Sequence, residues 1–286
     1  MITRFAPSPT GLLHLGHAYS AITAFDMAER VGGTFLLRIE DIDAARCSDA
    51  FEQQIFTDLT WLGLNWPLPV MRQSERRGAY ETALNTLNNL GLIYACTCTR
   101  ADIRAALSAP QEGAKSSNPG APVYPGTCRE LARPFRGGAL RLNMKRALAL
   151  AGCIEFTEYG DQHPGLTRIS PQTLLKTYGD IVLARRDIGT SYHLSVCIDD
   201  AAQGITDVVR GVDLFDSTPI HVLLQRLLEL ATPRYHHHGL IRDDHGKRLA
   251  KRDDARAISH YRNAGKSADD IREMVGIQAR LQHRFR

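Results

Sequence analysis

The first forty or so residues divide into three segments that differ in the spacing of their apolar positions. Residues 2–6 and 34–39 are short apolar runs, which are typical of strands. Between them, apolar residues recur every three or four positions, which predicts a helix that stops at Gly32-Gly33. The apolar positions of this helix are Ala18, Ala21, Ile22, Phe25 and Ala28. This order predicts two parallel strands joined by a right-handed helical crossover.

The same alternation returns in the second half of the chain. Residues 180–184 and 205–210 have strand character, and a helix with Ser191 as its N-cap is predicted between them. The apolar positions of that helix are Leu194, Cys197, Ile198 and Ala201. Thr218-Pro219 predicts a further helix, with threonine as the N-cap and proline at the first helical position. We therefore expect a second α/β half at about residues 175–240.

Residues far apart in the sequence are expected to meet at one edge of this parallel sheet. In such sheets, ligands bind outside the carboxyl ends of the strands. The segment Ala6-Pro7-Ser8 follows the first strand and Glu40-Asp41 follows the second. Arg210 ends a later strand, and Tyr192 begins a helix. The topology therefore predicts that these residues line one cleft.

Composition narrows the class of protein. Of the 286 residues, 43% are hydrophobic and 23% are charged, which is enough apolar material for a sizeable globular core. No apolar run reaches the length of a bilayer span, and the first residues have no signal-peptide pattern, so we expect no membrane partner. Six cysteines are too few for a disulfide scaffold of this length, which favours a reducing cytoplasm.

Positive charge is concentrated near the end of the chain. The formal net charge is +4, and residues 234–262 contain eight Lys or Arg against four Asp. Such a stretch favours a polyanion, although charge alone leaves a solvated surface loop as the alternative. The run His236-His237-His238 lies in a predicted strand, where neighbouring side chains face opposite ways. The three histidines are therefore not expected to share one metal ion, and a structural or phosphate-facing role is predicted.

Two segments carry candidate phosphate chemistry. Residues 7–17 combine glycines with His14 and His17 just before the first predicted helix, where backbone N–H groups and the helix dipole favour an anion. Residues 247–252 bring lysine and arginine side chains that can neutralise charge on phosphates. Each segment alone has an ordinary alternative, a glycine turn with incidental histidines in one case and a basic surface loop in the other.

Together, the two segments resemble the signatures of class I aminoacyl-tRNA synthetases. His14-Leu15-Gly16-His17 is similar to the HIGH signature, and Arg248-Leu249-Ala250-Lys251-Arg252 is similar to KMSKS. Ala250 replaces the usual serine, which removes one hydroxyl contact to ATP, while Lys251 keeps the cation. Residues 4–11 (RFAPSPTG), 38–43 (RIEDID) and 217–221 (STPIH) are similar to the glutamyl/glutaminyl branch. The resemblance implies an α/β fold with a Rossmann-like parallel sheet in the catalytic domain.

The resemblance also implies roles for individual residues. His14, His17 and Lys251 are expected to be catalytic, and with Gly16 they would bind ATP, which arrives with Mg²⁺. The glutamate-binding residues implied by the family are Arg4, Phe5, Ala6, Pro7, Ser8, Glu40, Tyr192 and Arg210. Charge supports this assignment, because arginines suit the carboxylates of glutamate and Glu40 suits its ammonium group. For Arg210 and Glu40, a structural ion pair is the alternative.

A cysteine cluster suggests a metal. Cys96, Cys98 and Cys128 could supply three thiolates to a structural Zn²⁺, one short of the usual four ligands, and reduced structural thiols are the alternative. The family resemblance implies that Tyr124 is the fourth ligand, in a Cys-x-Cys…Tyr-x-x-x-Cys motif. One structural zinc is therefore expected, in a loop-rich insert that has little core of its own.

The substrate expectation depends on length. The chain ends 35 residues after Lys251, whereas a full glutamyl-tRNA synthetase continues into a domain that reads the anticodon. We therefore expect a member of the shortened branch of the family, which attaches glutamate to queuosine in the anticodon loop of tRNA(Asp). The expected partners are L-glutamate, ATP and queuosine-modified tRNA(Asp), and we expect a monomer. The predicted organisation is a catalytic domain in two halves (1–95 and 176–252), an inserted zinc-bearing subdomain (96–175) and a short helical C-terminal segment (253–286).

Three alternatives remain open at this point. A glutamyl- or glutaminyl-tRNA synthetase core would share the pocket but charge the 3′ end of its tRNA. A small-molecule nucleotidyltransferase also uses a His-x-Gly-His turn, although the RIEDID stretch and the cysteine insert disfavour it. A non-catalytic tRNA-binding paralogue is disfavoured by the intact histidine pair and Lys251.

Overall fold

The predicted strand–helix–strand unit opens the fold. The computed structural model describes residues 1–99, 101–103, 123–131, 134, 138–185, 188–241 and 256–278. β1 (Ile2–Phe5) and β2 (Thr34–Ile39) pair in parallel, and α1 (Leu15–Glu29) connects them, as the apolar spacing predicts. The return to β2 needs glycine at position 33, because a Cβ there would lie 2.3 Å from the Met1 carbonyl oxygen.

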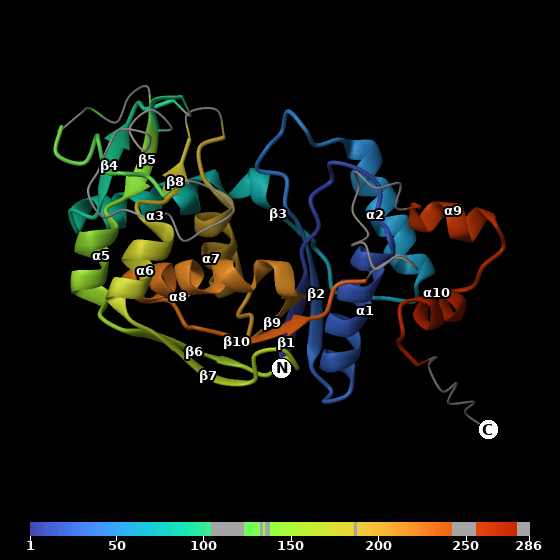
Figure 1. The fold of residues 1–286 in the computed structure, drawn as a ribbon. Helices are drawn as coiled ribbons and strands as arrows, with labels where there is room; N and C mark the ends of the chain where they lie inside the picture. Colours follow the sequence, from blue (N-terminus) through green and yellow to red (C-terminus); the bar gives the residue numbers. More distant parts are fainter. Residues whose placement is uncertain are drawn as a thin grey trace.

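Two neighbouring sheets with mostly parallel strands form the centre of the molecule (Figure 1). β2 pairs in parallel with the short β3 (Met71–Arg72). On its other side, β1 lies beside β9 (Asp207–Gly211), where the Thr206 backbone nitrogen donates to the Ile2 carbonyl at 3.0 Å. β9 is the edge strand of the second sheet, and three further strands extend that sheet away from β1. These are β10 (Arg234–His238) and β6 (Ile154–Glu158), both in parallel pairings, and the antiparallel β7 (Gly165–Ile169). The parallel sheet predicted from the sequence is thus confirmed.

Helices cover both faces of this sheet. The neighbouring β9 residues Val208 and Val209 enter two different hydrophobic clusters, because successive strand side chains point to opposite faces. One cluster packs α1 with α2 (Asp49–Trp61), α9 (Ile258–Asn263) and α10 (Ala268–Met274), grouped on one side in Figure 1. Five helices contribute to the other cluster. They are α3 (Arg77–Asn89), α5 (Met144–Ala151), α6 (Pro171–Tyr178), α7 (Tyr192–Ala202) and α8 (Thr218–Leu227).

A small antiparallel sheet lies away from the central one. Its order is β4 (Ile93–Cys96), β5 (Ala139–Leu142) and β8 (Val182–Ala184). Asp180, just before β8, is buried and accepts hydrogen bonds from the Tyr94 hydroxyl at 2.6 Å and from Arg129 at 2.8 Å. These contacts attach the cysteine-bearing end of β4 to the strand that leads back to the central sheet.

Some local predictions need correction. The 3₁₀ helix Val212–Ser217 runs directly into α8, so Ser217 rather than Thr218 is the N-cap. The Thr218 hydroxyl instead accepts a hydrogen bond from Arg210, which the local sequence does not reveal. A second 3₁₀ helix, Gln73–Arg76, leads into α3.

The C-terminal segment is helical, as predicted. Ile271 and Val275 are buried, but Met274 is 43% exposed because it points away from the packed face of α10. Within the described part of the chain, no helix is both long enough and apolar enough to cross a bilayer.

Candidate active site

A cavity of about 460 Å³ lies at the carboxyl ends of β1, β9 and β10, against the start of α1. Ten of the predicted site residues line it: Arg4, Phe5, Ala6, Ser8, His14, Gly16, His17, Glu40, Tyr192 and Arg210. Pro7 is buried behind them, and its carbonyl oxygen accepts the Glu40 backbone N–H at 3.0 Å, which joins the loops after β1 and β2. Lys251, with the rest of the basic segment 247–252, lies outside the described residues.

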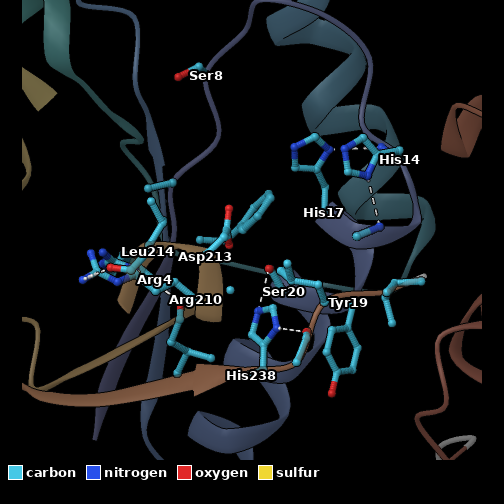
Figure 2. Close-up of a pocket in the computed structure, with 18 of the residues that line it drawn as sticks. Arg4, Ser8, His14, His17, Tyr19, Ser20, Arg210, Asp213, Leu214 and His238 are labelled. Carbon is cyan, nitrogen blue, oxygen red and sulfur yellow. Dashed lines mark hydrogen bonds between the residues drawn. The ribbon is translucent and has the colours of Figure 1, made fainter. Parts of the chain in front are cut away.

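Two histidines shape the start of α1. His14 is the N-cap, and its Nδ1 accepts a hydrogen bond from the Gly16 backbone nitrogen at 3.1 Å. The Nδ1 of His17 accepts one from the backbone nitrogen of His14, also at 3.1 Å. Because an accepting imidazole nitrogen carries no proton, each neutral ring has its proton on Nε2. The rings stack with centroids 3.8 Å apart, and this pair of donors stands beside the positive end of the helix dipole (Figure 2).

A buried carboxylate holds two arginines behind the cavity. Asp200 accepts from Arg4 Nε at 2.9 Å and Nη2 at 3.2 Å, and from Arg38 Nη1 at 2.8 Å. Burial raises the pKa of Asp200, but the two guanidinium groups outweigh it and lower that pKa overall. Arg4 also contacts the Val209 carbonyl, so three of the five N–H groups of Arg4 have partners among the described residues. One N–H on each terminal nitrogen therefore remains to bind a ligand.

Glu40 stands on the same wall of the cavity. Its carboxylate lies 3.4 Å from Arg38 Nη2, and no ion pair joins it to Arg210 among the described residues. Burial raises the pKa of Glu40, while Arg38 and Arg4 act in the opposite direction. The structural ion pair considered as the alternative is therefore present for Glu40, with Arg38 as its partner, whereas no ion pair is formed by Arg210 among the described residues.

Arg210 is buried without a carboxylate partner in the described part of the chain. Its guanidinium group donates to five neutral acceptors: His237 Nε2 (3.0 Å), His221 Nδ1 (3.1 Å), Thr218 Oγ1 (2.8 Å), the Leu214 carbonyl (3.3 Å) and the Tyr192 hydroxyl (3.5 Å). A buried positive charge that no contacting anion neutralises favours an anionic ligand in the adjoining cavity.

The cavity also contains residues that the sequence alone did not indicate. They are Tyr19, Ser20, Val209, Gly211, Asp213, Leu214, Gly239, Leu240 and Ile241. His238, for which a structural or phosphate-facing role was predicted, lines the cavity too. His238 Nε2 lies 2.7 Å from the Ser20 hydroxyl, and the Tyr19 ring meets the His238 ring edge-on (Figure 2). Strand alternation could have placed His238 at the ligand edge, since it ends β10. Tyr19 and Ser20 follow His17 on α1 but carry no motif.

The three consecutive histidines of β10 do not form a metal site. His237 is buried against Glu158 and Arg210, whereas His238 reaches Ser20. The His236 ring lies 5.3 Å from the Tyr159 ring, centroid to centroid. The alternation of the strand therefore separates His237 from His236 and His238, and the last two have different neighbours.

A second cluster of donor atoms lies in the small sheet. The sulfur atoms of Cys96, Cys98 and Cys128 all lie within 4.8 Å of one another, and this triad could hold a metal ion. The Tyr124 hydroxyl is 3.3 Å from Cys96 Sγ and 3.4 Å from Cys98 Sγ. In a tetrahedral site with Zn–S bonds of about 2.3 Å, neighbouring ligand atoms lie roughly 3.5–3.8 Å apart. The spacings of the Tyr124 hydroxyl from Cys96 and Cys98 are therefore close to those between neighbouring ligands of a tetrahedral ion.

The protonation of this cluster is uneven. Burial raises the pKa of the Cys128 thiol, but hydrogen bonds from Tyr124 and the Thr97 backbone outweigh it and lower that pKa to about 6. Burial raises the pKa of Cys98 to about 11. Burial and the hydrogen bonds to the cysteines raise the pKa of Tyr124. The Arg141 guanidinium lies 3.9 Å from the centre of the Tyr124 ring.

Comparison with known families gives a match along nearly the whole chain. Residues 1–278 match the family model described as tRNA synthetases class I (E and Q), catalytic domain. A protein of Rhodobacter capsulatus named Glutamyl-Q tRNA(Asp) synthetase is 58% identical over 282 residues, covering 97% of this chain and all of that protein. A protein of the same name from Nocardia farcinica is 41% identical, covering 94% of this chain and 81% of that protein.

Solved structures show the same similarity at the level of the fold. A glutamate tRNA ligase from Elizabethkingia meningosepticum, solved in complex with its amino acid, superposes with a TM-score of 0.74 at 26% identity. The match covers 96% of this chain but 60% of the ligase. The chain thus spans about three-fifths of the length of that ligase.

Proposed function

Because the chain belongs to the class I tRNA synthetases for glutamate and glutamine, we propose that it activates L-glutamate with ATP and transfers it to the queuosine base of tRNA(Asp). The single observation that carries this proposal is the cavity, where the histidine pair at the start of α1 faces the Arg4–Glu40–Arg210 wall. A nucleotide and a small dicarboxylic amino acid can therefore bind side by side. The choice of tRNA(Asp) is supported by the name of the relative that is 58% identical over its full length.

The first step joins glutamate to AMP. A carboxylate oxygen of glutamate attacks the α-phosphorus of ATP, and the bond to the departing pyrophosphate breaks. The Nε2–H groups of His14 and His17 and the N-terminus of α1 would stabilise negative charge on the phosphates. The enzyme supplies positioning and electrostatic stabilisation, and no protein nucleophile is required.

The wall opposite the histidines would hold the amino acid. The two N–H groups that Arg4 keeps, together with the charge of Arg210, suit the carboxylates of glutamate. Glu40 would accept the ammonium group, with the Tyr192 hydroxyl nearby. The charges of the two arginines and Glu40 thus complement the two carboxylates and one ammonium of the substrate.

Lys251 is proposed as the cation that assists the phosphates. The described residues before and after the basic segment support this role, because Ile241 lines the cavity and Ala257 forms an isolated β-bridge with His14. The backbone nitrogen of Ile258 also donates to the Leu13 carbonyl at 2.8 Å. The described residues on either side of the basic segment therefore lie beside the cavity and the start of α1. Mg²⁺ would enter with ATP, bound to its phosphates.

In the second step, a hydroxyl of the queuosine diol would attack the activated carbonyl of glutamyl-adenylate and release AMP. We propose a structural Zn²⁺ held by Cys96, Cys98, Tyr124 and Cys128. When bound, the ion supplies cross-linking of the insert rather than chemistry, because all four donors come from the protein and no open position remains for a substrate.

The proposed substrate is tested by transfer of labelled glutamate. We expect label on tRNA(Asp) that contains queuosine and none on the same tRNA without it, because the acceptor hydroxyl belongs to the modified base. After the reaction, nuclease digestion should release the label with the anticodon fragment of tRNA(Asp) and not with its 3′-terminal nucleoside. A parallel reaction with tRNA(Glu) is the control. Label on the 3′ ribose of tRNA(Glu) would instead favour a conventional synthetase core. Pyrophosphate exchange measures adenylate formation. If no exchange occurs, a non-catalytic paralogue would be favoured.

The fourth zinc ligand has its own test. We expect one zinc per chain by elemental analysis, and Tyr124→Phe should weaken zinc binding by at least about tenfold, because it removes one ligand atom. Tyr261→Phe, on α9, is the matched control and should keep normal zinc affinity. Unchanged affinity in Tyr124→Phe, measured by competition with a chromogenic chelator, would show that a different group completes the site.

A further inference from the structure

A buried carboxylate, that of Glu158, is linked to the guanidinium group of Arg210 through one intervening side chain, that of His237. Glu158 ends β6 and is 1% exposed, and its Oε2 lies 2.5 Å from Nδ1 of His237, which is equally buried. Glu158 Oε1 accepts two backbone N–H groups, from Gly160 at 2.6 Å and from His237 at 3.0 Å. A Cβ at position 160 would lie 2.8 Å from this Oε1 and 2.5 Å from the His237 carbonyl. Glycine therefore leaves room for a carboxylate whose orientation is fixed on both oxygens.

These contacts determine which nitrogen of His237 carries the proton. Nε2 of His237 accepts the Arg210 Nε–H at 3.0 Å, so it must be unprotonated. Nδ1 then carries the proton and donates it to Glu158. The carboxylate thus selects the one tautomer that can accept from Arg210. Burial and the nearby Arg210 lower the pKa of His237, although Glu158 opposes them, which agrees with a neutral ring.

A second neutral imidazole holds the opposite side of Arg210. His221 Nδ1 accepts from Arg210 Nη1, and His221 Nε2 then donates to His193 Nδ1 at 3.1 Å. Burial and Arg210 lower the pKa of His193 to about 4, and burial is also the largest cause of the lowered pKa of His221. Both sides of the Arg210 guanidinium group are therefore held by neutral acceptors. An acidic partner in direct contact would hold it equally well but would compete with an anionic substrate.

We propose that Glu158, acting through His237, is a positioning residue that fixes the Arg210 guanidinium group toward the cavity and thereby sets the affinity for glutamate. Glu158 orients Arg210 from a distance of one imidazole ring, so its own negative charge stays out of contact with the guanidinium group. This proposal rests on the proposed function, in which the charge of Arg210 attracts a carboxylate of glutamate. Glu158 itself does not line the cavity.

Glu158→Gln is the sharpest test because it keeps the size of the side chain. If the amide oxygen keeps the two backbone N–H groups, the amide nitrogen faces Nδ1 of His237 and drives its proton to Nε2. That proton then meets the Arg210 Nε–H, so two donors oppose each other. We expect KM for glutamate in pyrophosphate exchange to rise about 10- to 100-fold, with KM for ATP unchanged.

The matched control is Glu155→Gln on the same strand. Glu155 has an exposed side chain paired with Arg168, so its variant should behave like the unmodified protein. Glu158→Asp, which keeps the carboxylate, should recover part of the glutamate affinity. Thermal unfolding is recorded for each variant to show that it is folded. A general loss of stability would affect KM for glutamate and KM for ATP alike, whereas the proposal predicts a change in KM for glutamate alone.

Nitrogen-15 NMR of the imidazoles gives a readout that does not require activity. In the unmodified protein, His237 should carry its proton on Nδ1, and in Glu158→Gln the proton should move to Nε2. An Nε2–H tautomer in the unmodified protein would overturn the proposal, even if the variant failed to fold. An unchanged KM for glutamate in folded Glu158→Gln would overturn it as well. Glutamate-dependent exchange by the unmodified protein tests the proposed function separately.

Discussion

Arg4→Lys is expected to raise KM for glutamate about 100-fold in pyrophosphate exchange while the protein remains folded. Arg4 bonds Asp200 through Nε and Nη2 and still keeps one N–H on each terminal nitrogen among its described contacts. A lysine ammonium is a compact charge without the planar set of donors of a guanidinium group. It can approach Asp200 or the substrate carboxylate, but it cannot hydrogen-bond to both at once. Asp200 keeps its 2.8 Å contact with Arg38, so its buried charge stays paired.

The comparison variant is Arg46→Lys. Arg46 pairs with Asp43 at the surface, where its side chain is 72% exposed, so this substitution should leave both KM values unchanged. Calorimetric binding of glutamate without ATP separates loss of affinity from loss of chemistry. If Arg4→Lys binds glutamate with normal affinity, Arg4 serves only to hold Asp200, and its assignment to the substrate is wrong.

His17→Asn is expected to slow pyrophosphate exchange by about 100-fold or more, with KM for glutamate unchanged. The asparagine side chain can still accept the His14 backbone N–H, which preserves the cap of α1. It lacks an atom equivalent to Nε2, so the donor for the phosphate is lost. Removal of one preorganised donor to developing charge reduces the rate rather than the binding of the other substrate.

His163→Asn is a suitable control for this substitution. His163 is exposed and stacks on Phe215 at a centroid distance of 4.0 Å, and it does not line the cavity. Its variant should keep the normal exchange rate. An exchange rate in His17→Asn within about threefold of normal would mean that the helix N-terminus stabilises the phosphates without this imidazole.

Much of the architecture is predictable because its signals are local. The apolar run at residues 34–39 matches β2 in full, and the helical spacing before Gly32-Gly33 predicts α1. Ser191 caps α7 as expected, since its hydroxyl accepts the Leu194 N–H within the same turn. The N-cap of α8 was wrong by one residue, because Thr218 is drawn to Arg210 across the fold rather than to its own helix.

The residues of the candidate site also fall into two groups, those that the sequence indicates and those that only the tertiary structure reveals. Motif residues such as His14, Glu40 and Tyr192 could be proposed from the sequence, and the structure places them around one cavity. Their roles in binding and catalysis remain predictions. Neither Asp200 nor Glu158 could be proposed, because each acts on an arginine or histidine through contacts between residues 79 to 196 positions apart.

The amino-acid sequence by itself determined the order of strands and helices, the glycine turns and the kinds of side chain that can meet a phosphate or a carboxylate. These properties depend on backbone preferences and apolar periodicity over a few residues. Only the tertiary structure decided which nitrogen of each histidine carries its proton and which arginines keep donors for a ligand. Those properties are set by the hydrogen-bond partner on the far side of each group, and that partner comes from a distant segment of the chain.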